Sequence, residues 1–421
     1  MIRQRHSPNP ILDAWSTLGV RNRYHSIVSW ERDCVRAAVV ELGQGTAELI
    51  GLGAAAVHGV SPTSHPDIDR WVAGCDRALT QAEDMTQSIS GFKRVPDLVS
   101  MTVPAEMARR LPITASIARR HPTRSITQEE LSALLERGYR KAQDIVGTRG
   151  RQTDAEIVHG AVAQLALDGQ LVTDALGLHG TEIQARMSFA VIPLEWVRAL
   201  ETVCERLELR LVAIVPHDVV YAAPLVDPSA LLIILDERHT TVDMVRYGRL
   251  EWCAHTRLGE RDLVEQVAKN LGLEGHQADA LLHVYRGGQL PPASEMRVAR
   301  SFWIELQHWM DAISESVVRI NGDQALPHHV YFLDATRRIP EAQQSLDTPY
   351  WEQRLPFDRC PETMTLDVGM VHGVLDCTTQ AIGPAYLLLR GLAHYVASLY
   401  GPGRSLDRIL ASLIAQRRLR Y

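Results

Sequence analysis

The sequence predicts an α/β protein that is built from two lobes and a small inserted subdomain. Apolar, strand-like runs alternate along the chain with amphipathic helical segments, which is typical of layered α/β folds. Two of the strand-like runs are continuously apolar, as in strands that are buried on both faces. The chain has 421 residues, of which 46% are hydrophobic, enough for about two to four units with cores of their own.

The first part of the chain predicts a meander of strands with a helix packed on it. Strand-like runs lie at residues 26–30, 35–41, 47–52 and 98–103. The segment Gly43-Gln44-Gly45 predicts a hairpin turn between two of them. Residues 67–85 place apolar side chains at helical spacing, so we expect this helix to cover the sheet.

The middle of the chain continues the alternation. Thr127 followed by Glu130 is a capping box and predicts a helix from there to about residue 145. Further strands are expected at 158–166, 182–192, 211–215 and 231–235, and a further amphipathic helix at 193–207. The runs 211–215 and 231–235 are the two continuously apolar ones.

Composition excludes several classes of function. The formal net charge of −6 gives no general basic field, so we expect no nucleic-acid partner. The six cysteines form no Cys-x-x-Cys pair, and His328-His329 has no supporting acid at ligand spacing, so no metal site is predicted. Neither a signal peptide nor a membrane span is found. We therefore expect a cytoplasmic protein that meets a membrane only at its inner surface.

Several segments resemble a known family. Asp168-Gly169 is followed by the Gly-containing segment 174–180, residues 231–263 match a hairpin, its turn and the start of a helix, and Ile382-Gly383-Pro384-Ala385 matches a late helix. This order resembles the actin-like (ribonuclease H-like) fold, in the branch of the cell-division protein FtsA and the pilus-assembly protein PilM. The resemblance implies two lobes and an inserted small α+β subdomain.

The resemblance also implies where the domains begin and end. We expect an N-terminal extension at 1–23, a first lobe at 24–95 and 184–225, an inserted subdomain at 96–183, a second lobe at 226–399, and a linker with a C-terminal helix at 400–421.

Members of this superfamily hold ATP and Mg²⁺ with two phosphate-binding hairpins and a Gly-Gly adenosine loop, whose glycines let the ligand approach the backbone. The matching loops here lie at 29–36, 235–243 and 332–340, and none contains glycine. The residues that would face a nucleotide are Asp236, Thr240, Thr241, Glu31, Arg36 and Gly383. We expect a degenerate cleft without a cofactor and without catalytic residues. Binding of ATP with Mg²⁺ is the alternative.

The C-terminus predicts a basic amphipathic helix after the breaker cluster 400–403. Its apolar and basic residues are Leu406, Ile409, Leu410, Leu413, Ile414, Arg417 and Arg418. Such a helix can lie in a membrane interface, as the tail of FtsA-like proteins does. The alternative is a last helix that packs on its own domain.

From these features we expect a cell-division scaffold that links division components to the cytoplasmic membrane and associates with itself through residues 127–180. A pilus-assembly adaptor of the PilM kind is the first alternative, and an active ATPase is the second. A tail that binds membrane favours division, whereas a packed tail favours the pilus role.

Overall fold

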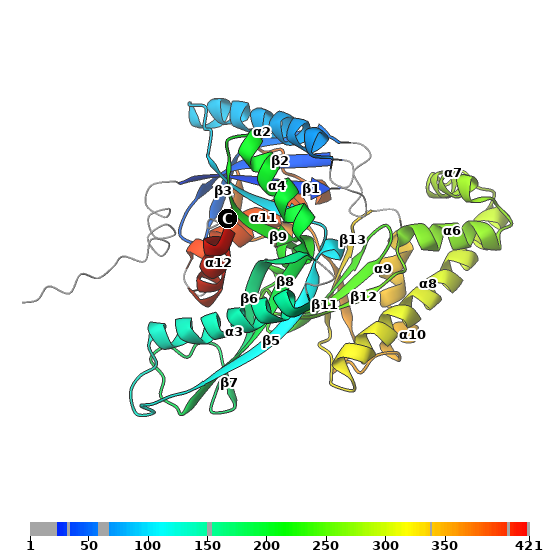
Figure 1. Cartoon of the computed structure of the whole chain (residues 1–421). Helices are drawn as coiled ribbons and strands as arrows, with labels where there is room; N and C mark the ends of the chain where they lie inside the picture. The colour runs from blue at the N-terminus through cyan, green and yellow to red at the C-terminus, as the bar shows by residue number, and fades with distance from the viewer. Residues whose placement is uncertain are drawn as a thin grey trace, which may run out of the picture. The chain divides into compact units, whose positions relative to one another are not determined.

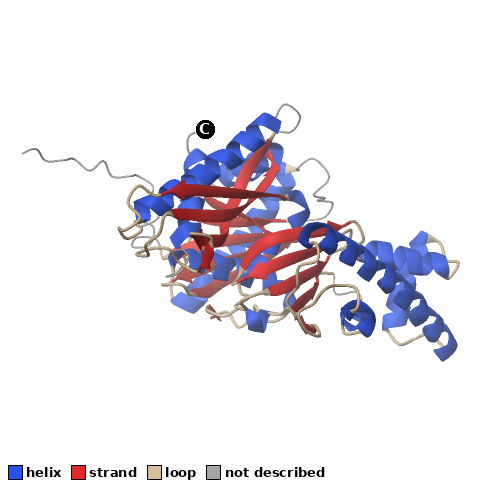
Figure 2. Ribbon diagram, turned by 90° about the horizontal axis from the view of Figure 1, so that it is seen from below, coloured by secondary structure: helices blue, strands red, loops and turns tan. Residues whose placement is uncertain are grey.

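The computed structural model describes residues 23–31, 34–57, 67–149, 154–336, 339–401 and 405–418. The chain divides into two compact units, and each is described by itself. Unit 1 comprises Met1–Leu225 with Val368–Tyr421, and unit 2 comprises Val226–Asp367. In Figure 2 the strands of the sheets, in red, lie against helices in blue.

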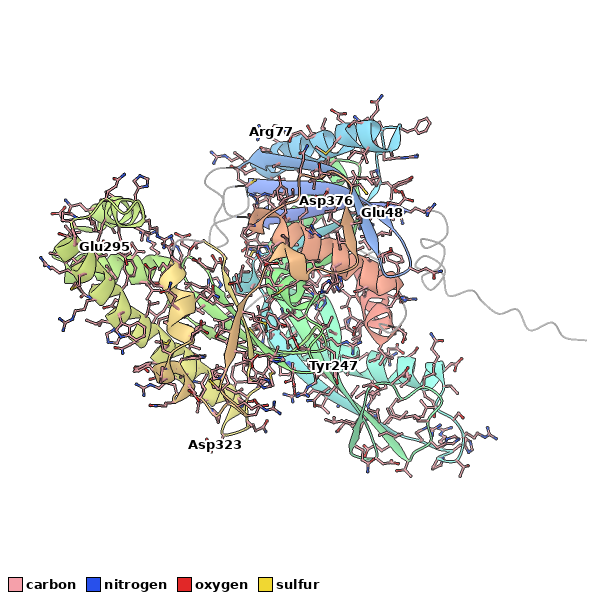
Figure 3. All side chains as sticks on the ribbon, turned by 180° about the vertical axis from the view of Figure 1, so that it is seen from behind. Glu48, Arg77, Tyr247, Glu295, Asp323 and Asp376 are labelled. Atoms are coloured by element: carbon pink, nitrogen blue, oxygen red, sulfur yellow. The ribbon has the colours of Figure 1, made fainter. Side chains whose placement is uncertain are left out.

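The larger sheet of unit 1 has the strand order β15-β3-β2-β1-β4-β9. Its strands are β1 (Tyr24–Glu31), β2 (Cys34–Leu42), β3 (Ala47–Ala56), β4 (Leu98–Val103), β9 (Arg210–Pro216) and β15 (Val374–Asp376). The first three strands form the predicted antiparallel meander, and β4, β9 and β15 join it in parallel. Figure 3 labels Glu48 of β3 and Asp376 of β15 at this edge of the sheet.

Helices cover both faces of this sheet. They are α2 (Ile68–Ser90), α4 (Leu194–Arg206), α5 (His217–Ala222) and α11 (Leu387–Tyr400), with short 3₁₀ turns η1 (Ala105–Met107), η2 (Val368–Met370) and η3 (Pro384–Tyr386). Helices α2 and α4 pack on one face of the strands and α11 on the other (Figure 1). Trp71 lies between Trp30 and Trp196, with ring centroids 4.4 and 5.1 Å away, so three aromatic rings form the centre of the core.

A second, four-stranded sheet in unit 1 forms the inserted subdomain, in the order β5-β8-β6-β7. Its elements are β5 (Arg109–Ala118), α3 (Gln128–Arg149), β6 (Ala155–Leu167), β7 (Gln170–Val172) and β8 (Glu182–Pro193). The capping box is confirmed: Thr127 N donates to Glu130 Oε2 (3.0 Å) and Glu130 N to Thr127 Oγ1 (3.4 Å). The helix α12 (Ser405–Arg418) packs on β6 and α3.

Unit 2 has one five-stranded sheet in the order β12-β11-β10-β13-β14. Its strands are β10 (Ala230–Leu235), β11 (Thr240–Arg246), β12 (Arg249–Thr256), β13 (His329–Asp334) and β14 (Glu362–Thr365). Its helices are α6 (Glu260–Asn270), α7 (Gly275–Arg286), α8 (Pro292–Asn321), α9 (Pro340–Leu346) and α10 (Pro349–Glu352). As predicted, β10 is buried along its whole length, because β11 and β13 flank it and helices pack against the sheet. The same prediction is wrong for β9 of unit 1, which is only half-buried over Leu211–Ala213 because it lies at the edge of its sheet.

The structure moves three of the expected domain boundaries. Strand β4 is expected in the inserted subdomain but pairs with β1 in the larger sheet. Strand β8 is expected in the first lobe but pairs with β5 and β6 in the small sheet. Residues 368–399 are expected in the second lobe but belong to unit 1, because β15 pairs with β3 and α11 packs on the same sheet. The extension at 1–22 lies outside the described residues.

Close packing of α2 on β3 generates the first prediction. A Cβ atom at Gly51 would lie 2.0 Å from the carbonyl oxygen of Ala82 in α2, and backbone cannot yield as a flexible side chain does. We expect Gly51→Ala to destabilise the protein by about 2 kcal/mol, measured by urea unfolding. Gly147→Ala is the matched control, because a Cβ atom there would meet nothing within 4 Å and alanine favours a helix. Equal stability of the two variants would contradict this packing.

A buried histidine generates the second prediction. His25 is 1% exposed and its Nε2 lies 3.0 Å from Ser100 Oγ. Burial lowers the pKa of His25 from 6.5 to about 4, so below pH 6.5 the unfolded chain binds a proton that the folded chain does not. Stability should be complete above pH 6.5 and fall by about 3 kcal/mol as the pH drops to 4. Urea unfolding across this range should show a smaller loss for His25→Gln, whereas His283→Gln, at an exposed site on α7, should follow the wild type.

Candidate functional site

An ion pair joins the two strands of the first predicted phosphate hairpin, β1 and β2. Arg36 pairs with Glu31 across the two strands, and its guanidinium carbon lies 5.8 Å from the ring centroid of Tyr386. Burial lowers the pKa of Arg36, but the charge and hydrogen bond of Glu31 raise it more, so the net shift is upward. The charge of Arg36 is therefore already neutralised by a protein carboxylate.

Gly383 lies beside this hairpin. Its carbonyl accepts a hydrogen bond from Tyr386 N (3.1 Å), and its φ of 95° belongs to the region that favours glycine. Thus Glu31, Arg36 and Gly383, which are far apart in the sequence, are brought together in unit 1 through Tyr386. No motif in the sequence points to Tyr386. Residues 32 and 33 of the hairpin lie outside the described residues.

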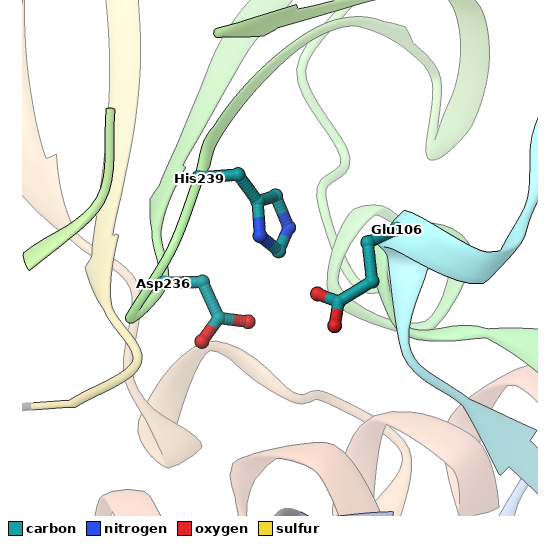
Figure 4. Close-up of side chains that lie close together, drawn as sticks. All are labelled: Glu106, Asp236 and His239. Atoms are coloured by element: carbon teal, nitrogen blue, oxygen red, sulfur yellow. The ribbon is translucent and has the colours of Figure 1, made fainter. Parts of the chain in front are cut away.

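The second predicted hairpin turns at residues 236–239 of unit 2. Leu235 pairs with Thr240, and Asp236 N donates to His239 O (3.0 Å). Figure 4 shows the side chains of Asp236 and His239 at the two ends of this turn. Asp236 Oδ1 accepts a hydrogen bond from Glu237 N (2.7 Å), so the carboxylate uses one of the amides that a phosphate would need.

The start of α6 packs directly on the same turn. Glu260 N donates to Asp236 O and Arg261 N to Glu237 O, both at 2.8 Å. A Cβ atom at Gly259 would lie 2.3 Å from Glu237 O, so only glycine permits this approach. Two N–H groups that could bind an anion at a helix N-terminus are therefore bonded to protein carbonyls.

The two threonines of this hairpin are buried and bonded within unit 2. Thr240 Oγ1 donates to Leu258 O (2.7 Å) and accepts from Trp309 Nε1 (2.8 Å). Thr241 Oγ1 lies 3.4 Å from Nδ1 of His255. Thr240 and Thr241 are 0% and 1% exposed. That they bind a nucleotide stays a prediction, although both hydroxyls have protein partners.

The predicted adenosine loop follows β13 and is held by one carboxylate. Asp334 Oδ1 accepts from Thr336 N (3.0 Å) and Thr336 Oγ1 (2.7 Å), and Oδ2 accepts from Ile339 N (2.9 Å). This folds the loop on itself with Ile339 fully buried. The arginines at 337 and 338 lie outside the described residues.

Unit 1 contains the same turn after β15. Asp376 Oδ1 accepts from Thr378 N (3.0 Å) and Thr378 Oγ1 (2.5 Å), and Oδ2 accepts from Ala381 N (2.8 Å). Sequence reasoning missed this repeat. The signal is present, because Asp-x-Thr favours such a turn and occurs at both positions.

The C-terminal helix is packed on its own unit. Leu410 and Ile414 are 0% and 4% exposed in the core of the small sheet, and Leu406, Ile409 and Leu413 pack around them. Asp407 Oδ1 accepts a hydrogen bond from Val162 N of β6 (3.0 Å), and Arg408 donates to the carbonyls of Leu399 and Gly401. The apolar face of this helix therefore lies against the small sheet, as in the alternative of a packed last helix. That the helix can bind a membrane stays a prediction, because periodicity alone does not distinguish a membrane from a protein core. The side chains at 417 and 418 are not described.

Solved structures resemble this chain over most of its length. A chain of the PilM–PilN type IV pilus biogenesis complex matches with a TM-score of 0.55 and 13% identity, over 89% of this chain and 98% of that chain. The ethanolamine utilization protein EutJ from Carboxydothermus hydrogenoformans matches with 0.45 and 12%, over 92% and 97%. The nucleotide-free diol dehydratase-reactivating factor matches with 0.48 and 10%, over 89% and 100%.

The likeness to the chain of the PilM–PilN complex shows the actin-like fold, as predicted. Identities this low establish the fold and not an activity. No protein-family model matches the sequence, and a comparison with curated proteins gives no match. Among the described residues, no helix is both long and apolar enough to cross a membrane.

The packing of α12 generates the third prediction. Leu410→Asp places a charge in a core and should cost about 3 kcal/mol or more, seen as a lower midpoint of thermal unfolding. Leu413→Asp, at a partly buried site on the same helix, should cost clearly less. If α12 served lipid binding instead, both variants would keep the wild-type midpoint and lose binding to anionic vesicles in flotation.

Proposed function

We propose that this chain is an assembly adaptor with the actin-like fold, which joins protein partners and does not turn over ATP. One observation supports this above all: the first N–H groups of α6, at Glu260 and Arg261, donate to carbonyls of the 236–239 turn. A nucleotide phosphate at this hairpin would have to replace these bonds. It would also approach the carboxylates of Asp236 and Glu237, which repel it.

The first hairpin supports the same proposal. In unit 1 the Glu31 carboxylate neutralises Arg36, the one basic side chain predicted to face a nucleotide there. Adding a triphosphate would require breaking this pair or leaving Glu31 close to the phosphates. In each unit, groups that were predicted to face a phosphate make contacts within the protein instead.

For the partners, we propose proteins of a pilus-assembly complex. The likeness to a chain of the PilM–PilN complex supports this role, and so does the packed state of α12, which favours the pilus alternative over division. Self-association through residues 127–180 is part of the proposal.

A cell-division scaffold at the inner membrane surface is the second candidate. The amphipathic and basic sequence of α12 favours it. This role requires that α12 leave the small sheet, exposing Leu410 and Ile414 and breaking the bond between Asp407 and Val162. Because these contacts stabilise the packed state, we rank this role below the adaptor.

Calorimetric titration tests the proposal and gives the fourth prediction. ATP or ADP with Mg²⁺, added to the full chain up to millimolar concentration, should give no saturable heat. A complex with a purified pilus-assembly partner should have the same affinity with and without Mg–ATP.

Saturation at one nucleotide per chain would contradict the adaptor proposal and restore the ATPase alternative. In that case Asp236→Asn, which removes a negative charge from the turn, should change the affinity. Asp323→Asn removes an exposed charge just after α8 and is the charge-matched control.

A further inference from the structure

Two adjacent histidines at the amino end of β13 form a cluster that the proposed function does not use. The ring centroids of His328 and His329 lie 4.3 Å apart with an interplanar angle of 63°. His328 Nδ1 lies 3.0 Å from Asp358 Oδ1, and His329 Nδ1 lies 3.0 Å from Asp227 Oδ1. The sequence shows no supporting acid at ligand spacing from these histidines, but the fold supplies two. Asp358 lies 30 positions from His328 and Asp227 lies 102 positions from His329 along the chain.

The backbone holds one of these acids in place beside the histidines. Asp358 N donates to Leu326 O (2.8 Å), and Glu362 N donates to His328 O (2.7 Å). The segment with Asp358 therefore runs next to the segment with His328 and is fixed on both sides of the carboxylate.

The second acid, Asp227, is held by contacts of both its backbone and its side chain. The Asp227 carbonyl accepts from the amide of Tyr247 (3.0 Å), which Figure 3 labels. The hydroxyl of Tyr331 donates to the other carboxylate oxygen, Oδ2. Burial, together with this hydrogen bond, raises the pKa of Tyr331, so the hydroxyl keeps its proton and remains a donor at physiological pH.

These contacts select one form of each imidazole. A carboxylate only accepts hydrogen bonds, so each Nδ1 must carry a proton, and Nε2 of the neutral ring keeps its lone pair. Among the described residues, neither Nε2 has a hydrogen-bond partner. The side chains of His328 and His329 are 21% and 32% exposed, so solvent reaches them.

We propose that His328 and His329 bind one divalent transition-metal ion of the zinc or nickel class through their Nε2 atoms. Protein histidines that bind metal almost always donate the other ring N–H to a carboxylate or carbonyl, which is the arrangement of both rings here. The ring centroids lie 4.3 Å apart and metal–nitrogen bonds are about 2.0–2.1 Å long, so the proposal requires the two Nε2 atoms to converge on one ion, with water completing its coordination. Hard ions such as Mg²⁺ prefer oxygen ligands.

Titration of the full chain with Zn²⁺, followed by calorimetry, tests this site. The wild type should bind one ion, and His328→Ala and His329→Ala should each weaken binding at least tenfold. Asp227→Asn keeps both rings and should weaken binding about 10–100-fold. His308→Ala is the matched control, because His308 contacts Glu305 (3.4 Å) but has no neighbouring histidine; it should bind as the wild type does.

A second readout covers variants that fold poorly. Asp358→Asn changes a carboxylate that is 46% exposed, so it should fold normally and still weaken binding. Zn²⁺ should raise the thermal midpoint of the wild type and not that of His328→Ala. Absence of saturable binding in the wild type, or wild-type affinity in a variant lacking both histidines, would overturn the proposal. So would loss of binding in Cys360→Ser alone, since this exposed thiol lies two residues after Asp358.

Discussion

The hydroxyl group of Thr240 connects three elements of unit 2. It donates a hydrogen bond to the carbonyl of Leu258, just before α6, and accepts one from the indole N–H of Trp309 in α8. The backbone of Thr240 also pairs with Leu235 of β10. Trp309 is fully buried in the core of this unit. A buried hydroxyl without partners would cost about 1–3 kcal/mol, whereas here its hydrogen-bonding capacity is used. The position of the turn, the helix start and the core residue therefore depend on one another.

This dependence supports the proposal that the hairpin predicted to bind phosphate has a structural role in this chain. Backbone N–H groups and hydroxyls near a helix N-terminus attract any acceptor. In this chain the acceptors are the carbonyls of Asp236 and Glu237 and the carbonyl of Leu258. Because the acceptors are part of the chain, the same groups that could hold a ligand stabilise the folded unit.

Local signals in the sequence predicted individual helices and strands, but they did not predict which sheet a strand joins, because that depends on pairing with distant strands. The capping box at Thr127 and the apolar run of β10 are local, and both predictions are confirmed. The sheets to which β4 and β8 belong depend on partner strands far along the chain, which periodicity does not encode. The amphipathic pattern of α12 predicted its apolar face, but a membrane and the core around Leu410 select the same pattern.

The candidate site was also only partly predictable from the sequence. The loops without glycine and the repeated Asp-x-Thr turn at Asp334 and Asp376 are visible in the sequence. The contact of Arg36 with Tyr386 is revealed only by the fold.

Parallel pairing gives the two ends of the unit 2 sheet different chemistry. Strands β10 and β13 run in the same direction. Asp236, just after β10, and Asp334, the last residue of β13, therefore lie at one end of the sheet, and His329 lies at the other. His329 and Asp334 are five residue steps apart along the strand, roughly 16 Å. At the carboxyl end each carboxylate accepts hydrogen bonds from amides of its own loop. At the amino end the carboxylates of Asp358 and Asp227 orient imidazoles whose Nε2 atoms have no hydrogen-bond partner in the described part of the chain, so the proposed metal site and a nucleotide site would lie at opposite ends of this sheet.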